Sequence, residues 1–368
     1  MALASLSLRG LARHYGPVRA VDDLDLEVAD GDFVTLLGPS GCGKSTTLNL
    51  IAGLDRPDAG TIHLGDRDVT RVPPNERRMA MVFQSYALYP NMTVFENIGF
   101  SLKLRKQPTA QIAERVTAVA EMLDIGHLLN RKPAQLSGGQ QQRVALGRAL
   151  VKQPLVFLLD EPFSNLDAAL RARMRTEVKH LHRALGTTSV FVTHDQEEAM
   201  TLSDMICVMR EGKIVQAGTP MEIYAKPRTI YVAEFVGKPR MSLIDGRLEY
   251  GADGVVFVGP DVRIDLGPAA ALGLKERVAG TVALGIRAED VVVHPDGAGA
   301  ARTSFSASVG LTEPIGSDTF VELAVGETTI VARVDPDLAI SRGQSVAAEL
   351  RASGIHLFDR ETTERIVA

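Results

Sequence analysis

One glycine-rich loop near the start of this 368-residue chain has the residue types and spacing needed to hold phosphate. It follows the apolar run 33–37 and precedes a stretch with helical spacing of apolar residues that begins at Leu48. In a strand–loop–helix arrangement of this kind, glycines let backbone N–H groups close around phosphate oxygens, and the N-terminus of the helix favours negative charge. A glycine-rich turn that merely precedes a helix is the alternative, and both flanking elements count against it. The loop consists of Gly38, Pro39, Ser40, Gly41, Cys42, Gly43, Lys44, Ser45 and Thr46.

Three side chains of this loop carry chemistry of their own. Lys44 can reach the β- and γ-phosphates of a nucleotide, and the Ser45 hydroxyl can ligate Mg²⁺. Cys42 lies beside Lys44 and several backbone N–H groups, surroundings that we expect to stabilise a thiolate. These residues predict a site for a nucleoside triphosphate with its magnesium ion.

Two carboxylates follow another apolar run, at residues 155–159. In an open parallel sheet, ligands gather at the carboxyl ends of the strands. Asp160 can hold Mg²⁺, through water, and Glu161 can accept a proton from an attacking water. An acidic loop that only caps a buried strand is the alternative, and taken alone the pattern favours neither. Beside the phosphate loop, these carboxylates supply the acidic half of an NTPase site.

Two more expected strands end in polar side chains. The run 79–83 is followed by Gln84, and the run 189–193 by His194. Taken singly, the glutamine reads as a solvated loop amide and the histidine as a structural residue. One mechanism uses both, because Gln84 can complete the shell of Mg²⁺ and water while His194 donates to the γ-phosphate.

The elements that must position these residues follow from hydrophobic periodicity. Residues 6–28 alternate as an antiparallel strand pair with one solvated face, whereas the four later runs are apolar on both faces, as a helix-covered parallel sheet requires. Helical spacing over 112–123 ends near Gly126, and a hairpin is expected at 205–217 with its turn at 211–212. After about residue 236, short apolar runs with frequent glycine predict a small all-β domain at 240–368.

Composition narrows the class of protein. The net charge of −5 and a sequence pI of about 5.9 argue against a nucleic-acid partner. We find no apolar run near the roughly 20 residues that span a bilayer, and no signal-peptide pattern at the N-terminus. The two cysteines belong to no metal-binding cluster. We expect a chain that is made and kept in the cytosol and that partners hold at any membrane it serves.

The segment 136–143, LSGGQQQR, resembles the signature of the ABC ATPase family and lies just upstream of the acidic strand, as in that family. Ser137 and the following glycines open a helix and can form a second anion nest. An N-capped helix with a flexible lead-in is the alternative, which accounts for the serine but not for the glycines and glutamine. The family's signature positions here are Ser137, Gly138, Gly139 and Gln140.

The resemblance extends to other loops. Residues 164–167 look like the family's D-loop, which assigns Asp167 to the partner-facing side of the ATP site, and residues 193–195 look like the switch loop, which makes His194 its histidine. Tyr15 matches the aromatic residue that stacks on adenine, with Ala20 close by. A strand-packing role is the alternative for this tyrosine.

The resemblance implies an α/β P-loop NTPase cassette over residues 1–236, with a parallel sheet core, an antiparallel β subdomain and a helical subdomain at about 87–150. It also implies ATP and Mg²⁺ as cofactors. A head-to-tail homodimer would hold each ATP between the phosphate loop of one subunit and the signature of the other. The segment with Tyr86, Leu88, Tyr89 and Met92 would bind one of two transmembrane permease subunits, although a partly buried apolar loop is the alternative reading.

Within the family, the chain resembles ATPase subunits of bacterial carbohydrate importers of the maltose and glycerol-phosphate type. Three features carry this likeness: residues 79–98, residues 131–151, and an OB-like (TOBE) domain suggested by residues 284–290, 313–316 and 357–359. Gln141 and Ser242 depart from the importers' usual arginine and asparagine. The likeness implies a peripheral protein at the cytoplasmic face of the cell membrane, served by an extracytoplasmic solute-binding protein through the permease.

The transported solute stays open, because the ATPase does not touch it. Import of another small solute is an alternative. A soluble ABC ATPase of repair or translation is a rival, but the stretch 84–136 is too short for a repair-type coiled coil and the chain has one cassette. An exporter subunit is another rival, disfavoured by the absence of fused membrane helices and by the C-terminal domain.

Overall fold

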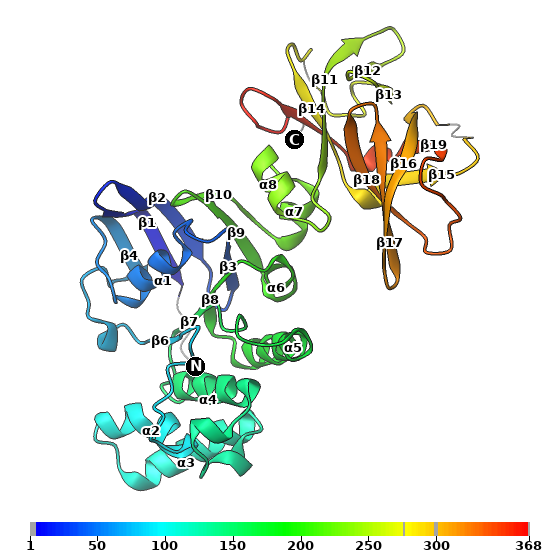
Figure 1. The fold of residues 1–368 in the computed structure, drawn as a ribbon. Coiled ribbons are helices and arrows are strands. Elements are labelled where there is room, and N and C mark those ends of the chain that lie inside the picture. Colours follow the sequence, from blue (N-terminus) through cyan, green and yellow to red (C-terminus); the bar gives the residue numbers. More distant parts are fainter. Residues whose placement is uncertain (1–4, 275–276, 298–300, 367–368) are drawn as a thin grey trace. The chain divides into compact units, whose positions relative to one another are not determined.

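The computed structural model describes residues 5–274, 277–297 and 301–366, which form two compact units (Figure 1). The first unit spans residues 1–221 and the second residues 222–368. This division lies earlier than the join that the sequence suggests at 236–240. None of the helices in the described ranges has the length and apolar character needed to cross a bilayer.

The N-terminal sheet of the first unit is antiparallel, with strand order β2-β1-β4-β5. Its strands are β1 (Leu6–Tyr15), β2 (Val18–Val28), β4 (Ala59–Leu64) and β5 (Arg67–Asp68). The predicted pair β1–β2 is confirmed: Leu6, Leu8 and Leu11 are buried along one face, and the register shifts between Leu8 and Leu11. The sequence did not identify β4 and β5.

The central sheet has six strands in the order β10-β9-β3-β8-β7-β6. The four predicted runs form parallel strands: β7 is displaced by one residue, β8 begins one residue earlier than predicted, and β6 ends one residue earlier. The predicted hairpin is confirmed as β9–β10 at the sheet's edge, where β9 also pairs in parallel with β3. All residues of β3 and β8 are buried, as expected for strands covered on both faces. The strands are β3 (Phe33–Leu37), β6 (Met79–Val82), β7 (Val156–Asp160), β8 (Thr188–Thr193), β9 (Met205–Arg210) and β10 (Lys213–Gly218).

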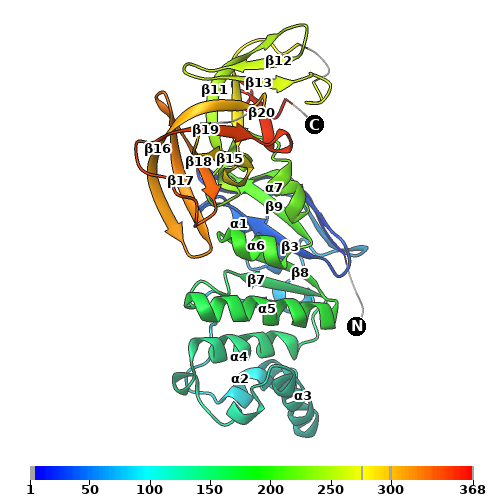
Figure 2. The ribbon, with the colours of Figure 1, turned by 90° about the vertical axis from the view of Figure 1, so that its right-hand side faces the viewer.

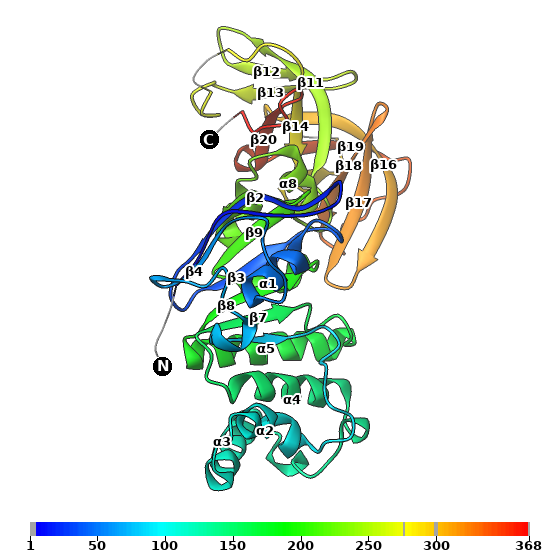
Figure 3. The ribbon, with the colours of Figure 1, turned by 90° about the vertical axis from the view of Figure 1, so that its left-hand side faces the viewer.

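Helix α1 (Lys44–Ala52) packs with the central sheet and β2 in one core (Figure 3). On the other side, α5 (Ala168–Leu185) lies between the sheet and α4 (Gly138–Leu150), and α2 (Val94–Leu104) and α3 (Thr109–Met122) lie beyond α4 (Figures 2 and 3). The short α6 (Gln196–Leu202) follows β8. The predicted helix over 112–123 is present as α3, and Gly126 begins a separate 3-10 turn at Gly126–Leu128.

The second unit is built from two five-stranded antiparallel sheets, ordered β13-β12-β11-β14-β20 and β15-β19-β16-β17-β18. This confirms the predicted all-β C-terminal part. The strands are β11 (Ser242–Tyr250), β12 (Val255–Val258), β13 (Arg263–Gly267), β14 (Val282–Ile286), β15 (Val291–His294), β16 (Ser304–Ile315), β17 (Asp318–Val325), β18 (Thr328–Val334), β19 (Ser345–Leu350) and β20 (Ile355–Asp359).

Two short helices precede these strands, α7 (Pro220–Ala225) and α8 (Ile230–Phe235). Ile230 and Ala233 of α8 are buried in a cluster with Phe358 of β20, and the Ile230 N–H donates to the carbonyl of Thr363 at 2.9 Å. The buried Arg287 guanidinium donates to the carbonyls of Tyr224 and Val236 at 2.7 and 2.9 Å. These contacts explain why the structural division comes before α8.

Candidate ATP-hydrolysis site

The phosphate loop connects β3 to α1, as the sequence predicts. A Cβ atom at Gly43, whose φ is 106°, would lie 2.2 Å from the carbonyl oxygen of Ala20, so only glycine fits there. The loop is also bonded to distant segments, because the Gly212 N–H donates to the Cys42 carbonyl at 3.0 Å and the Asp22 N–H donates to the Gly212 carbonyl at 3.0 Å. Two other parts of the chain therefore form the wall behind the loop.

Lys44 is buried, and its ammonium is held inside the loop. Its Nζ donates to the carbonyls of Gly38 and Pro39, both at 2.8 Å. The Ser45 Oγ donates to Asp160 Oδ1 at 3.1 Å, across from the end of β7. The cation and the hydroxyl that the sequence assigns to phosphate and metal thus lie in one loop next to the first of the two carboxylates.

Cys42 differs from the expectation of a stabilised thiolate. Its side chain is buried, and burial raises the pKa of the thiol more than the neighbouring Lys44 lowers it. The Lys44 Nζ lies 3.8 Å from the sulfur. The sequence shows the cation and the N–H groups near Cys42 but not how much solvent the folded loop excludes, and solvent exclusion is the larger effect.

The two carboxylates end β7 in different environments. Burial and the adjacent Glu161 raise the pKa of Asp160, against the lowering effect of its hydrogen bond with Ser45. Glu161 has a left-handed backbone with φ of 42°, uncommon for a residue with a side chain. Its N–H donates to the Val192 carbonyl at 3.0 Å, and the Ser164 Oγ donates to its carbonyl at 2.9 Å. These bonds hold Glu161 in a conformation that is otherwise disfavoured.

His194 follows β8 and lies beside Glu161, with 3.3 Å between Nδ1 and Oε2. The histidine is more than half exposed and the glutamate side chain is 19% exposed. Gln84 is exposed after β6, and its backbone carbonyl accepts a hydrogen bond from Asn165 Nδ2 at 2.8 Å. Phosphate loop, carboxylates and histidine thus meet at the carboxyl edge of the sheet, and Asn165 connects Gln84 to the loop after β7.

The signature residues have local structural roles, of which the sequence argument included only the capping role of Ser137. Ser137 caps α4: its Oγ accepts from the Gln140 N–H at 3.4 Å, and Gln140 Oε1 accepts from the Ser137 N–H at 3.0 Å. A Cβ on Gly139 would lie 2.9 Å from a methyl carbon of Leu170. Helix capping thus accounts for the glutamine as well as the serine, which the sequence argument did not allow for, whereas the second glycine is explained by packing against Leu170 rather than by capping.

Asp167 of the D-loop caps α5, where its carboxylate accepts from the Leu170 N–H at 2.9 Å. The Tyr15 hydroxyl donates to Asp55 Oδ2 at 2.5 Å, and the guanidinium of Arg13 lies 4.7 Å from the centre of its ring. Arg13 thus covers one ring face, while Tyr15 as a whole is 48% exposed. Asp55 and Arg13 were not singled out in the sequence, since neither belongs to a recognisable motif.

In the segment expected to bind a permease, Tyr86 is buried, Leu88 and Met92 are half-buried, and Tyr89 is 41% exposed. The Arg148 guanidinium of α4 lies 5.4 Å from the centre of the Tyr89 ring and donates to the Ala87 carbonyl at 2.6 Å. Only part of this segment is therefore available to a partner in the first unit as it stands.

Magnesium would find oxygen donors here rather than a preformed cage. Within the described ranges, no group of three or more His, Cys, Asp or Glu side chains is arranged to hold a metal. Ser45 and Asp160 already share a hydrogen bond, and the Gln84 amide is exposed. Few protein ligands with room for water and phosphate oxygens suit Mg²⁺.

Comparison with known proteins agrees with this geometry. A family model described as "ABC transporter" matches residues 21–164, one described as "MalK OB fold domain" matches residues 237–291, and one described as "TOBE domain" matches residues 284–358. The first unit resembles the dimeric structure of MJ0796, a bacterial ABC transporter cassette, with a TM-score of 0.53 and 30% identity over 58% of this chain and 98% of that chain. The same cassette is also known in a post-hydrolysis state bound to ADP and Pi.

Full-length relatives match both units. The sulfoquinovosyl glycerol transport ATP-binding protein SmoE of Agrobacterium fabrum is 47% identical over 99% of this chain and 100% of its own length. The sn-glycerol-3-phosphate import ATP-binding protein UgpC of Ralstonia nicotianae is 44% identical over the whole of both chains. The trehalose/maltose import ATP-binding protein MalK of Thermococcus litoralis is 47% identical over 99% of this chain and 100% of its own. The chain therefore belongs to the ABC transporter family, in which it is an ATP-binding and ATP-hydrolysing subunit.

Proposed function

We propose that this protein energises the import of a sugar or a related polar solute through partner permease subunits. The observation that carries this proposal is the similarity over the full chain to relatives named for the import of trehalose/maltose and sn-glycerol-3-phosphate. The match of the second unit to MalK OB fold and TOBE domains favours the same class. The protein would work at the cytoplasmic face of the cell membrane, with an extracytoplasmic solute-binding protein delivering solute to the permease.

We infer the following roles in hydrolysis. Lys44 and the N–H groups of the phosphate loop offset charge on the transferred phosphate, which is the main task in phosphoryl transfer. Glu161 accepts a proton from the attacking water, and His194 donates a hydrogen bond to the γ-phosphate. The 3.3 Å separation of Glu161 and His194 supports this pairing, because it leaves both groups beside one reacting centre.

Ser45, Asp160 and Gln84 would hold Mg²⁺, in part through water. When bound, the ion offsets the charge of the β- and γ-phosphates. The 3.1 Å hydrogen bond between Ser45 and Asp160 supports this assignment, since it places both oxygens close together. Tyr15 would stack on adenine, which its 48% exposure supports.

The active form is proposed to be a head-to-tail homodimer. Ser137, Gly138, Gly139, Gln140 and Asp167 of one subunit would face the ATP held by the phosphate loop of the other. Support comes from the exposed N-terminus of α4, whose N–H groups and helix dipole favour an anion. The segment around Tyr89 would contact a permease subunit.

Substitution of Glu161 by Gln tests both the proposed base and the dimer. The amide keeps the size of the side chain but cannot accept the proton, and loss of a general base costs about 10²–10⁴ in rate. ATP should still bind through Lys44, Ser45 and Asp160. Because ATP that binds only the closed dimer stabilises it by mass action, sizing the Glu161→Gln protein should show more dimer with ATP and Mg²⁺ than with ADP.

A second substitution, Ser137→Trp, is the matched probe of the partner's phosphate nest, since it crowds that nest without touching the phosphate loop. It should reduce the ATP-dependent dimer. If the Glu161→Gln protein hydrolyses ATP at nearly the normal rate, Glu161 is not the general base. If it is inactive but forms no more dimer with ATP than with ADP, the proposed head-to-tail homodimer is refuted. Copurification of the permease from the native cell, followed by uptake assays with sugars and sugar phosphates, tests the class of solute.

A further inference from the structure

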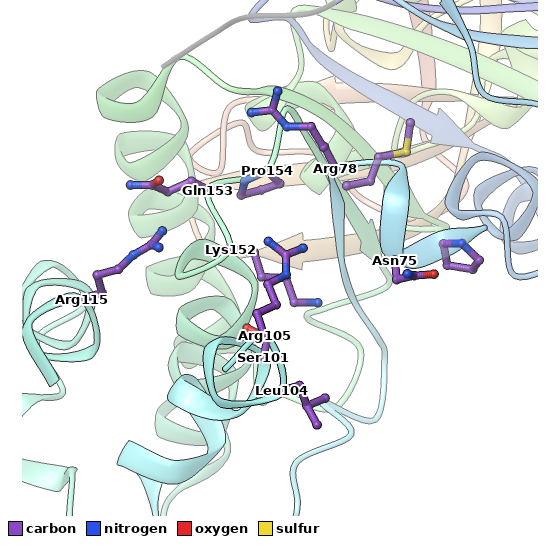
Figure 4. A pocket seen from close by; sticks show the side chains of 11 residues that line it. Asn75, Arg78, Ser101, Leu104, Arg105, Arg115, Lys152, Gln153 and Pro154 are labelled. Atoms are coloured by element: carbon purple, nitrogen blue, oxygen red, sulfur yellow. The ribbon is translucent and has the colours of Figure 1, made fainter. Parts of the chain in front are cut away.

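A cleft with several cationic side chains lies in the first unit, away from the ATP-hydrolysis site. It has a volume of about 530 Å³ and is lined by the segment before β6, the end of α2, the side of α3 and the connection from α4 to β7 (Figure 4). Four cationic side chains line it: Arg78, Arg105, Arg115 and Lys152. We call these four residues and their cleft the basic pocket.

The basic pocket has no internal counter-charge. No aspartate or glutamate lines it. Among the described residues, Arg78, Arg105 and Lys152 form no ion pair, although the chain as a whole carries a net charge of −5. Enclosure by the cleft, followed by the neighbouring guanidinium groups of Arg148 and Arg105, lowers the pKa of Lys152, although much of its side chain remains accessible to solvent. Cations gathered in this way repel one another unless an anion joins them.

Local structure explains only part of this cluster. Arg105 is the C-terminal cap of α2, and Lys152 follows the end of α4, so both benefit from helix dipoles. Arg115 donates to the Val151 carbonyl at 3.0 Å and ties α3 to the end of α4. Arg78 has no such role, and its backbone adopts a left-handed φ of 54°. The helix ends offset part of the repulsion between these cations but do not account for four of them in one cleft.

Uncharged donors accompany the cations. The Oγ of Ser101, which lines the cleft, is buried without a hydrogen-bond partner, and Asn75 adds an amide to the lining. A buried hydroxyl without a hydrogen-bond partner destabilises the folded protein, and a bound acceptor would offset that cost. The cleft therefore offers both charged and neutral hydrogen-bond donors to a ligand.

The topology separates the basic pocket from the ATP-hydrolysis site. Strands β6 and β7 are parallel, and Arg78 and Pro154 precede them, whereas Gln84 and Glu161 follow them. The pocket therefore lies at the opposite edge of the sheet from the phosphate loop. A smaller cleft of about 240 Å³ shares Pro74, Asn75, Met79 and Lys152 with it and reaches Phe83 and Arg148, close to the segment after Gln84.

We propose that the basic pocket binds a small phosphate-bearing anion at a site distinct from the ATP site. Its volume is that of a small-ligand pocket. A single carboxylate would leave most of the four cations without a partner, whereas a phosphate group carries nearly two charges and three strong acceptor oxygens. The occupied pocket would place negative charge beside the ends of α2 and α4, next to the segment proposed to contact a permease.

Titration calorimetry with inorganic pyrophosphate tests this site in the full chain, in magnesium-free buffer at fixed ionic strength. Wild type should bind at two sites, the phosphate loop and the basic pocket. The Arg105→Gln/Lys152→Gln protein should lose one of them, with affinity there reduced about tenfold or more, the effect of losing charge-assisted hydrogen bonds. Lys44→Ala should weaken only the other. Both substituted pocket residues are exposed, and their side chains make no hydrogen bond in the described structure, so folding should be unaffected.

Lys103→Gln/Lys106→Gln is the matched control, because it removes the same charge from exposed residues near the end of α2 that do not line the pocket. If the control weakens pyrophosphate binding as much as Arg105→Gln/Lys152→Gln does, the anion is attracted by the overall charge of this region rather than bound in the pocket, and the proposal is overturned. Two unchanged sites in Arg105→Gln/Lys152→Gln, or one site in wild type that Lys44→Ala abolishes, would overturn it as well. Sedimentation with phosphatidylglycerol vesicles distinguishes two sources of the phosphate. If the ligand is a lipid headgroup, the wild type should sediment with the vesicles and the Arg105→Gln/Lys152→Gln protein should not. If it is a soluble phosphate, neither protein should sediment.

Discussion

At the scale of single residues, the environment of Cys42 shows how solvent exclusion competes with nearby charge. Lys44 and loop N–H groups favour the thiolate, but the sulfur is buried and the pKa of the thiol is raised. Sequence shows only the charged neighbours, because the exclusion of water depends on β9 and β2, which meet the loop from distant parts of the chain. The side-chain identities at the site were therefore predictable, and their pKa directions were not.

We expect Cys42 to react slowly with a maleimide at pH 7, and faster as the pH rises toward its elevated pKa, since the thiolate is the reactive form. Saturating ATP should slow the reaction further by covering the loop. Cys207 is fully buried, and burial raises its pKa to about 12, so it should react more slowly still. Mass spectrometry of each labelled cysteine against time measures this. Labelling of Cys42 at the rate of a free thiol, or without effect of ATP, would contradict the prediction.

His356 of β20 gives a prediction for pH. Burial, and next the cations Arg365 and Arg287, lower its pKa to about 4. The folded protein keeps this imidazole neutral, while the unfolded chain takes up a proton below the ordinary pKa of about 6.5. Its contribution to stability is thus complete above that pH and is lost as the pH falls toward 4. The loss should reach roughly 3 kcal/mol.

Denaturant unfolding of the full chain between pH 7 and pH 4.5 measures this loss. His356→Phe keeps an aromatic ring beside Phe358 and removes the proton site, so its stability should fall less with acid than that of wild type. His180→Gln, at an exposed position on α5, is the control and should follow wild type. Identical acid sensitivity of His356→Phe and wild type would assign the loss to other groups.

At the scale of elements, two helices of the first unit begin with the same device. Thr93 and Glu96 form a capping box at α2, with bonds of 3.2 and 2.8 Å, as Ser137 and Gln140 do at α4. Loss of a capping hydroxyl costs about 1 kcal/mol. Thr93→Ala and Ser137→Ala should therefore lower the free energy of unfolding by similar amounts.

Their effect on ATP hydrolysis should differ. If the N-terminus of α4 contacts ATP of the partner, Ser137→Ala lowers turnover, whereas Thr93→Ala leaves turnover unchanged. Urea unfolding and steady-state ATPase assays on both variants make the comparison. Equal turnover in the two variants would reduce Ser137 to a helix cap.

Elements with a clear hydrophobic period were predicted well, because burial on one or both faces imposes that period directly. The strands of the central sheet and the hairpin at its edge are examples. Strands β4 and β5 were missed, since β4 has two exposed residues at its start and β5 has only two residues. The role of Gly139 was also missed, because its neighbour Leu170 belongs to another helix.

At the scale of the whole molecule, the position of α8 determines where the chain can be cut. A fragment of residues 1–221 should unfold in a single transition and bind ATP, because every residue of the proposed phosphate and metal site lies within it. A fragment of residues 1–240 keeps α8 but loses Phe358 and Ala283, which cover Ile230 and Ala233. We expect the longer fragment to bind more hydrophobic dye and to aggregate at a lower temperature. Equal behaviour of the two fragments would favour a join at 236–240.

The basic pocket also belongs to this scale. Its cations come from four segments between residues 78 and 152, and no short motif relates them. The residues of the ATP-hydrolysis site were predictable because strand ends deliver them to one edge, a rule that sequence order alone can apply. A cluster assembled by helix packing follows no such rule, so it is visible only in the folded chain.

The wall behind the phosphate loop bears on protein engineering. A motif search treats residues 38–46 as a self-contained part, yet the carbonyl of Ala20 and the turn at Gly212 shape it through atoms that every amino acid carries. Transplanting the nine residues into another strand–helix scaffold would transfer their side chains but not the two backbone segments that contact the loop. The transferable part is instead the loop together with β2 and the β9–β10 turn, and a graft of this larger part should keep Gly43 at its φ of 106°.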